Sequence, residues 1–420
     1  MLTVKQRKII GFLFLALCFA YAIRPVFKES LFRHVDARCF YVNGVCWLSG
    51  KCPYHMDVYR GVWKESMKND NFRKELSNDH PGATIHPPSL AIYTMPSAFF
   101  AWETGKYYYD FMNVIFLLAI IFFLTRLIKD LPSMRANVGQ IEFVMGLGCL
   151  NTALQFTISH GQLSFLALTG ALGAFYFSER KQFFIAGLFV VLASMKPHVA
   201  LLFIIYLFIQ QRDWRFFGWS SLLVGTTFIG VLIMGGDLNP IPEIVANYKL
   251  YAEFGPNAPS RMLGLTNLMA FLGISRTILI SLGLAIVTVL ALWFRKMNIA
   301  PNNHGTSEIW MSHKKEQGIL AMALIFAVTA LFMPLHMPDY TIFFTVVILL
   351  VVVRWDLARW LIPGIILVAR PDNMVNVLSY VIEMPVSRFL IASLGAVYLT
   401  LTIAIIIWKL RTEVLEAIQH

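Results

Sequence analysis

Residues 389–408 read FLIASLGAVYLTLTIAIIIW, a run of 20 residues that contains no charge. A helix needs about 20 apolar residues to cross the hydrocarbon core of a bilayer, which is about 30 Å thick. Apolar runs of comparable length occur at residues 9–27 and 279–294. Because such runs recur from one end of the chain to the other, the sequence predicts one all-α, polytopic integral membrane domain over residues 1–420.

The composition also favours a membrane protein. Hydrophobic residues make up 57% of the chain and charged residues 14%, whereas soluble domains carry about 25% charged residues. The formal net charge of +11 could indicate a nucleic-acid partner. Most of the basic excess, however, lies in short segments beside apolar runs, as is typical of cytoplasmic loops. We therefore expect membrane lipids as neighbours, no nucleic-acid partner, and a cytoplasmic N-terminus around Lys5, Arg7 and Lys8.

The basic flanks give a consistent order of spans, which lie near residues 107–125, 136–158, 162–178, 215–235, 276–295, 317–333, 339–353 and 386–408. With the first span and shorter segments, the total is about 11 to 13 transmembrane helices. Two segments are exceptions. Residues 183–195 and 197–211 are short for spans, and Lys196-Pro197 between them predicts a hairpin that carries Lys196 and His198 toward the outer side. Residues 86–102 contain three prolines, which predicts a bent, half-inserted segment.

Three polar segments are predicted to lie outside the hydrocarbon core. Residues 28–105 form a large first extracytoplasmic loop that includes the half-inserted segment, residues 236–273 form a second one, and residues 296–316 form a cytoplasmic connector. In the first loop, Tyr59, Val62, Trp63 and Met67 recur at helical spacing. This pattern predicts an interfacial helix that lies flat on the membrane surface.

Three of the five cysteines, Cys39, Cys46 and Cys52, lie in the first loop. If that loop faces an oxidising compartment, one pair could form a disulfide. A zinc site is the competing interpretation, but the spacings are not C-x-x-C. We therefore expect no metal site in this protein.

Polar and ionisable residues are concentrated at the predicted outer ends of the helices. The chain lacks the G-x-x-x-x-G-K-[ST], G-x-G-x-x-G, H-E-x-x-H and G-x-S-x-G motifs, which removes support for nucleotide-driven pumping and serine hydrolysis. The candidate site residues are Asp36, Tyr41, His86, His160, Gln162, Lys196, His198, Arg261, His336 and Asp339.

Several short motifs together resemble one family. Residues 36–41 (DARCFY) and 50–54 (GKCPY) resemble the first outer loop of glycosyltransferase family 87, in which an Asp precedes a G-x-x-P-Y element. Residues 86–90 (HPPSL) resemble its Y-P-P-L element, with His86 in place of the commoner Tyr. Gly161-Gln162, Lys196-Pro197 and Pro334 follow in matching order, so the resemblance covers about two thirds of the chain.

The resemblance implies a fold of the GT-C type and an inverting transfer of a mannose-like or arabinofuranose-like sugar. The donor would be a polyprenyl-phosphate sugar, and the acceptor a hydroxyl of a lipid-linked molecule or a cell-envelope glycan. Asp36 inherits the role of general base, a role that typically contributes about 10²- to 10⁴-fold. The other candidates would bind substrate, and neither metal nor cofactor is required. The expected location is a bacterial inner membrane, with the active site on the periplasmic or extracellular side.

Other interpretations remain open at this point. A transporter or flippase of a lipid-linked sugar would be expected to show internal repeats and charges near the bilayer midplane. A membrane acyltransferase would need a buried His, for which His160 and His198 are candidates. Each residue also has a structural explanation: Asp36 could be a solvated loop charge, and Lys196 a lysine that extends to the interface. His336 and Asp339 could simply pair with each other.

Overall fold

The computed structural model describes residues 3–28, 33–68, 84–131, 139–253, 257–297, 307–382 and 387–419. These residues form α-helices and short 3-10 helices, with no strand among them. The α-helices are α1 (Val4–Ile23), α2 (Val35–Leu48), α3 (Met56–Ser66), α4 (Ala91–Ala98), α5 (Trp102–Lys129), α6 (Gln140–Cys149), α7 (Thr152–His160), α8 (Ser164–Glu179), α9 (Phe183–Ser194), α10 (Pro197–Gln210), α11 (Trp214–Met234), α12 (Ile241–Glu253), α13 (Leu265–Leu268), α14 (Arg276–Met297), α15 (Ser307–Phe332), α16 (Phe344–Val347), α17 (Leu349–Val352), α18 (Trp355–Ala358), α19 (Ile362–Ala369), α20 (Pro371–Ile382) and α21 (Arg388–Gln419). The 3-10 helices are η1 (Arg24–Phe27), η3 (Pro88–Leu90), η6 (Pro259–Arg261), η7 (Ala270–Leu272), η8 (Met337–Phe343) and η9 (Arg359–Leu361).

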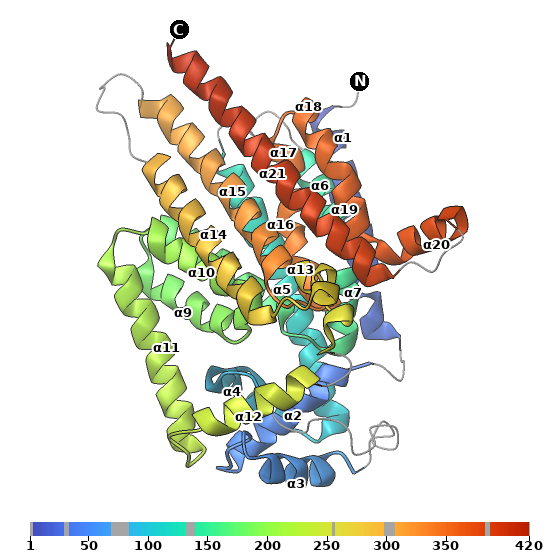
Figure 1. The fold of residues 1–420 in the computed structure, drawn as a ribbon, viewed down its shortest axis with the longest axis vertical. Helices are drawn as coiled ribbons and strands as arrows, with labels where there is room; N and C mark the ends of the chain where they lie inside the picture. Colours follow the sequence, from blue (N-terminus) through green and yellow to red (C-terminus); the bar gives the residue numbers. More distant parts are fainter. Residues whose placement is uncertain are drawn as a thin grey trace.

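The long helices form a bundle, and the helices α2, α3, α4 and α12 lie at one of its ends (Figure 1). Both termini lie at the opposite end, the top of Figure 1, whereas α2, α3, α4 and α12 lie at the bottom. Buried apolar side chains run through the bundle in one large cluster that includes residues of α5, α8, α10 and α15. The outward faces of α1, α11, α14 and α21 remain apolar and exposed, as expected for helices that contact lipid.

The number of membrane spans is smaller than the sequence predicts. Six helices of the described residues are long and apolar enough to cross a bilayer, or seven if α6 and α7 form one bent span. Three further apolar segments, α9, α10 and residues 337–352, are shorter. The structure therefore supports a helical membrane protein, but it does not support 11 to 13 transmembrane helices. The sequence overestimates the count because several apolar runs form broken or short helices.

Two of the predicted interruptions are present. Residues 86–102 are not one helix: η3 and α4 precede a break at residues 99–101, and α5 then begins at Trp102. Pro96 lies inside α4. Likewise α9 ends before Lys196, and α10 begins at Pro197, where a missing N–H costs nothing at the first helical position. An interruption that was not predicted divides residues 136–158, because α6 and α7 meet at a bend of 58°.

In the first loop, part of the apolar face of α3 is covered by protein. Tyr59 and Met67 are each only 1% exposed, and the hydroxyl of Tyr59 donates to the carbonyl oxygen of Cys39 on α2. Tyr59 and Met67 on the apolar face of α3 therefore pack against protein, whereas Val62 and Trp63 stay partly exposed. That α3 lies on the membrane surface stays a prediction. Periodicity alone could not distinguish these two ways of burying an apolar face. All five cysteines are free, so the structure contains none of the disulfides that the first loop could form.

The boundaries of the predicted loops fall partly outside the described residues. Within the first loop, residues 29–32 and 69–83 are not described, and residues 298–306 of the predicted cytoplasmic connector are not described either. The second predicted loop, residues 236–273, contains α12, η6, α13 and η7. Of these, α12 is important for the site because it carries Tyr251.

Candidate active site

Asp36 lies in the first turn of α2, and the start of this helix is held by a buried ion pair. His34 precedes the helix with a φ of 62°, and its backbone N–H donates to the carbonyl oxygen of Ser159 at 2.6 Å. Nε2 of His34 lies 3.0 Å from Oδ1 of Asp110 on α5, and Arg33 pairs with the other oxygen of the same carboxylate. These contacts fix the position of Asp36 relative to α5 and α7.

The Gly161-Gln162 motif brings a side-chain amide to Asp36. Gly161 ends α7 with a φ of 69°, and a Cβ at this position would lie 2.6 Å from the Cβ of Ala37. Only glycine therefore allows both the left-handed turn and this close approach to α2. The next residue, Gln162, donates from Nε2 to Oδ2 of Asp36 at 2.7 Å. Nδ1 of His160 lies 3.7 Å from the same oxygen.

Lys196 occupies the break between α9 and α10, and its side chain is 3% exposed. Its ammonium group donates to three acceptors: Oε1 of Gln162 at 2.5 Å, Oγ of Ser164 at 3.0 Å and Oδ1 of Asp339 at 2.6 Å. An ammonium group has three protons, so its hydrogen-bonding capacity is fully used. Gln162 and Lys196 thus connect the carboxylates of Asp36 and Asp339. The amide nitrogen of Gln162 donates to Asp36, its amide oxygen accepts from Lys196, and Lys196 contacts Asp339.

These contacts join one polar cluster, the Asp36 cluster, which consists of Asp36, His160, Gln162, Ser164, Lys196, His198 and Asp339. Asp339 is its most enclosed member, with a side chain that is 1% exposed. Besides Lys196, it accepts from Oγ of Ser164 at 2.7 Å and from the backbone N–H of His336 at 3.0 Å. Nε2 of His198 lies 3.6 Å from its second oxygen. A buried charge of this kind requires such compensation, because an unpaired carboxylate would be costly in this environment.

Two further histidines approach the same cluster and are held neutral. Burial lowers the pKa of His86 to about 3, and the nearby positive charge of Lys196 adds to this effect. The ring of His86 packs edge-on against Phe40, with the ring centroids 5.2 Å apart. Burial also lowers the pKa of His336, although the charge of Asp339 opposes the shift. Both rings can therefore serve as neutral hydrogen-bonding groups at physiological pH.

Most of the predicted site residues thus lie together, but two do not. The hydroxyl of Tyr41 donates to the carbonyl oxygen of Phe100 at 2.8 Å, and its ring packs edge-on against Trp102. Tyr41 therefore supports the break between α4 and α5. Arg261 is exposed on η6, and among the described residues no side-chain contact joins it to the cluster. Substrate binding by these two residues remains a prediction from the sequence alone, and the site built from the contacts does not include them.

Sequence reasoning missed three residues that belong to this region. Ser164 completes the contacts of Lys196, and Asp110 anchors the start of α2. Burial raises the pKa of the phenol of Tyr251 on α12, and the nearby negative charges of Asp36 and Asp339 add to this effect. A signal existed for Asp110, because an acidic residue inside an apolar helix is rarely without a function. Nothing local in the sequence marks Ser164 or Tyr251.

A cavity of about 730 Å³ lies at the other end of the helices. Ser164, at the start of α8, belongs to the cluster, whereas Glu179 at the end of α8 lines the cavity. A helix of this length separates the two by about 24 Å. Basic side chains that line the cavity are Arg180, Lys181, Arg212, Arg295 and Lys315. We assign the site to the Asp36 end because the carboxylates and histidines converge there.

A family model described as glycosyltransferase family 87 matches residues 85–311, which is more than half of the chain. The chain belongs to glycosyltransferase family 87. Family 87 membership, together with the apolar helices, makes it a membrane glycosyltransferase. No curated protein and no solved structure matches the chain.

The family 87 match covers only part of the predicted site residues. Within the matched residues lie His86, His160, Gln162, Lys196, His198 and Arg261; outside them lie Asp36, Tyr41, His336 and Asp339. The membership therefore establishes the class of enzyme, while the roles of Asp36 and Asp339 must be argued from their contacts. The cluster offers one partly exposed carboxylate and one buried ion pair, and beside it lie two neutral histidines, His86 and His336.

Proposed function

We propose that this glycosyltransferase transfers a mannose-like or arabinofuranose-like sugar from a polyprenyl-phosphate carrier to a hydroxyl of a lipid-linked or glycan acceptor, with inversion. The observation that carries the proposal is the hydrogen bonding of Asp36. One oxygen of its carboxylate accepts from Gln162, and among the described residues no donor contacts the other oxygen. The side chain is 33% exposed, so an acceptor can reach it.

Asp36 is proposed to act as the general base of a single displacement. The acceptor oxygen forms a bond to the anomeric carbon while the bond from that carbon to the phosphate oxygen breaks. The hydroxyl proton passes to the free oxygen of Asp36, and the carrier leaves as polyprenyl phosphate. A hydroxyl is a weak nucleophile until its proton is removed, and a positioned carboxylate typically contributes about 10²- to 10⁴-fold to such a step.

The leaving phosphate is proposed to lie on the side of the cluster where His198 and His336 are found. The side chain of His198 is 29% exposed, and it lies in the first turn of α10, where the helix dipole favours an anion. Lys196 adds a fixed positive charge close by. Because its three protons are already used, Lys196 can contact phosphate directly only by releasing one of its present partners. We therefore propose that Lys196 acts chiefly through its charge and through the position of Gln162.

The transfer step is proposed to need no metal ion. The leaving group carries one phosphate and no pyrophosphate, and in this structure an ammonium group contacts the Asp339 carboxylate at 2.6 Å. A divalent cation at the same place would have to compete with Lys196 for that carboxylate. Stabilisation of the developing anion would instead come from hydrogen bonds and from the charge of Lys196.

The cluster is proposed to face the extracytoplasmic side of a bacterial inner membrane. The basic residues Arg126, Lys129, Arg180 and Arg295 lie at the ends of helices α5, α8 and α14, away from the Asp36 cluster. The positive-inside rule places such an end in the cytoplasm. A flippase would need ionisable residues along the membrane interior, whereas those of this cluster gather at one end of α8.

The proposal is tested by offering purified protein a panel of polyprenyl-phosphate sugars and a panel of nucleotide sugars, each with a lipid-linked acceptor. We expect release of polyprenyl phosphate from at least one mannose or arabinofuranose donor. Transfer from a nucleotide sugar, with no release from any polyprenyl donor, would contradict the proposed donor class.

A further inference from the structure

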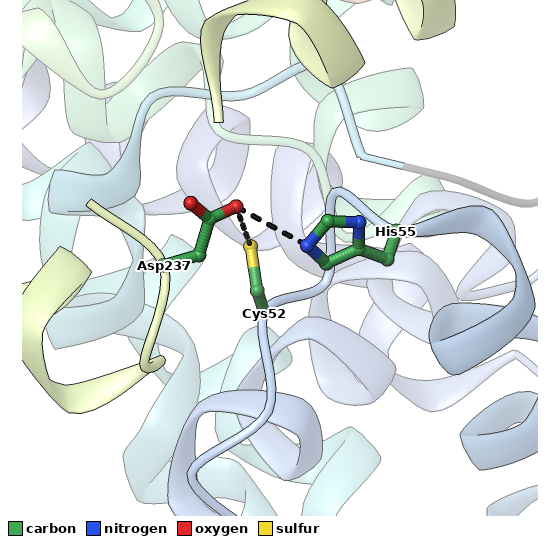
Figure 2. A group of neighbouring side chains, drawn as sticks. All are labelled: Cys52, His55 and Asp237. Atoms are coloured by element: carbon green, nitrogen blue, oxygen red, sulfur yellow. Dashed lines mark hydrogen bonds and ion pairs between the residues drawn. The ribbon is translucent and has the colours of Figure 1, made fainter. Parts of the chain in front are cut away.

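A second group of polar side chains lies outside the Asp36 cluster, where two loops meet. Cys52 and His55 belong to the segment between α2 and α3, and Asp237 belongs to the segment between α11 and α12. Figure 2 shows the three side chains directed toward one another. Oδ2 of Asp237 lies 3.6 Å from Sγ of Cys52 and 3.2 Å from Nε2 of His55.

These separations are those expected between ligands of one zinc ion. In a tetrahedral site the bonds are about 2.3 Å to sulfur, about 2.05 Å to nitrogen and about 2.0 Å to oxygen. The tetrahedral angle then separates sulfur from oxygen by about 3.5 Å and nitrogen from oxygen by about 3.3 Å. The observed 3.6 Å and 3.2 Å agree with both values. The third pair of ligand atoms also lies within 4.8 Å.

The surroundings orient the three ligand atoms. Sγ of Cys52 donates to Oδ2 of Asp237, so the thiol is directed toward the carboxylate. The backbone N–H of Asn239 donates to Oδ1 of Asp237 at 2.9 Å and leaves Oδ2 directed toward the other two ligands. Hydrogen bonds of this kind orient the ligands of known metal sites. Cys52 is 4% exposed, whereas the His55 side chain is 45% exposed, so an ion can enter from the His55 side.

We propose that Cys52, His55 and Asp237 bind one Zn²⁺ ion, with water as the fourth ligand. Thiolate, imidazole and carboxylate are the three ligand types that Zn²⁺ takes in proteins. On binding, the zinc–sulfur bond forms and the thiol proton of Cys52 is released to solvent. The ion, the thiolate and the carboxylate then sum to zero charge, so the partly buried site carries no net charge.

The metal would link the first loop to α12. Tyr54 lies between the two ligands Cys52 and His55; its carbonyl oxygen accepts from Asn247 of α12 at 2.8 Å, and its hydroxyl donates to the carbonyl oxygen of His86 at 2.5 Å. The same α12 carries Tyr251 near the two carboxylates. We therefore assign the ion a structural role: it holds α12 and the His86 segment in place, and it takes no part in the transfer step.

A cobalt titration of the full-length wild-type protein in detergent tests the site directly. After treatment with a chelator and its removal, Co²⁺ should produce a thiolate-to-cobalt charge-transfer band that saturates at one equivalent, and Zn²⁺ should abolish the band and raise the thermal midpoint. A folded wild-type protein without this band would overturn the proposal. The measurement needs no variant and no substrate, so it stands apart from the proposed transferase reaction.

Variants identify the ligands. We expect Cys52→Ser to lose the band and Asp237→Asn to weaken Co²⁺ binding by about ten-fold or more. Cys149→Ala removes a different thiol, and Asp57→Asn removes an exposed acid of α3; both should bind Co²⁺ as the wild type does. A band that survives in folded Cys52→Ser, or one that is lost in Cys149→Ala, would show that another thiol holds the metal and would overturn the assignment.

Discussion

The start of α2 and the start of η8 each place one carboxylate in the same cluster, but the two carboxylates have different surroundings. Asp339 is 1% exposed and contacts an ammonium group, a hydroxyl, a backbone N–H and an imidazole. Asp36 is 33% exposed, accepts from one amide and has an imidazole at 3.7 Å. The fully paired carboxylate can organise the site, whereas the carboxylate with a free oxygen can accept a proton. The predictions below test this division of roles.

The largest effect on stability is expected from Asp339→Asn. This change leaves the buried ammonium group of Lys196 without a counter-charge, and the loss of one partner of a buried ion pair typically costs about 3–5 kcal/mol. Thermal unfolding in detergent would show a clearly lowered midpoint, and turnover would fall as well because Gln162 loses its fixed neighbour. An unfolding midpoint equal to that of the wild type would mean that the pair is not structurally important.

A double variant separates charge compensation from function. Lys196→Met together with Asp339→Asn removes both charges, so we expect it to unfold at a higher temperature than Asp339→Asn alone. Turnover should remain low, because no positive charge is left beside the leaving phosphate. Restored turnover in the double variant would contradict the proposed role of Lys196.

A smaller effect is expected from the pH dependence of stability. The pKa of His86 is lowered to about 3 in the folded protein, whereas an unfolded histidine has a pKa of about 6.5. Between these values the unfolded state binds more protons, so His86 decreases stability as the pH falls below about 6.5, by up to about 2 kcal/mol at pH 5. The His86→Gln variant should lose less stability than the wild type between pH 7.5 and pH 5, and equal losses would contradict the shift.

Arg261 provides a control outside the cluster. It is exposed on η6, and surface substitutions of this kind usually change free energies by less than about 0.5 kcal/mol, or about two-fold in rate. We therefore expect Arg261→Ala to keep turnover within about two-fold of the wild type in the donor assay. A loss of ten-fold or more would place Arg261 at the substrate and would extend the site toward η6.

Removal of divalent cations is expected to leave turnover unchanged in a protein that lacks the proposed zinc site. In the Cys52→Ser protein, which should not hold zinc, EDTA should leave turnover unchanged, because Lys196 supplies the positive charge near the leaving phosphate. Turnover that is abolished by EDTA and restored by Mg²⁺ or Mn²⁺ in this variant would show that the transfer step itself requires a metal.

The sequence predicted the local features of the fold and failed on those that depend on distant residues. The break at Lys196-Pro197 and the interruption of residues 86–102 follow from proline chemistry, which acts within a few residues. The sequence could not predict that α6 and α7 would meet at a bend, or that α3 would pack against α2. Both depend on neighbours brought together only by folding.

The site shows the same limit. Asp36, Gln162, Lys196 and Asp339 were recognisable as polar groups at predicted helix ends, but which of them pair was not. Asp339 and Ser164 are 175 residues apart, and Cys52 and Asp237 are 185 residues apart. The spacing of Cys52 and His55, C-x-x-H, is a local signal for a pair of metal ligands, but no spacing in the sequence connects this pair to Asp237.

The most direct test of the account compares Asp36→Asn with Asp57→Asn, an exposed acid in the first turn of α3. The amide at position 36 keeps the shape of the side chain but cannot take the proton of the acceptor. We expect Asp36→Asn to unfold at nearly the wild-type temperature and to lose about 10²- to 10⁴-fold in kcat, while Asp57→Asn keeps wild-type turnover. Near wild-type kcat in a folded Asp36→Asn protein would contradict the assignment of Asp36 as the base.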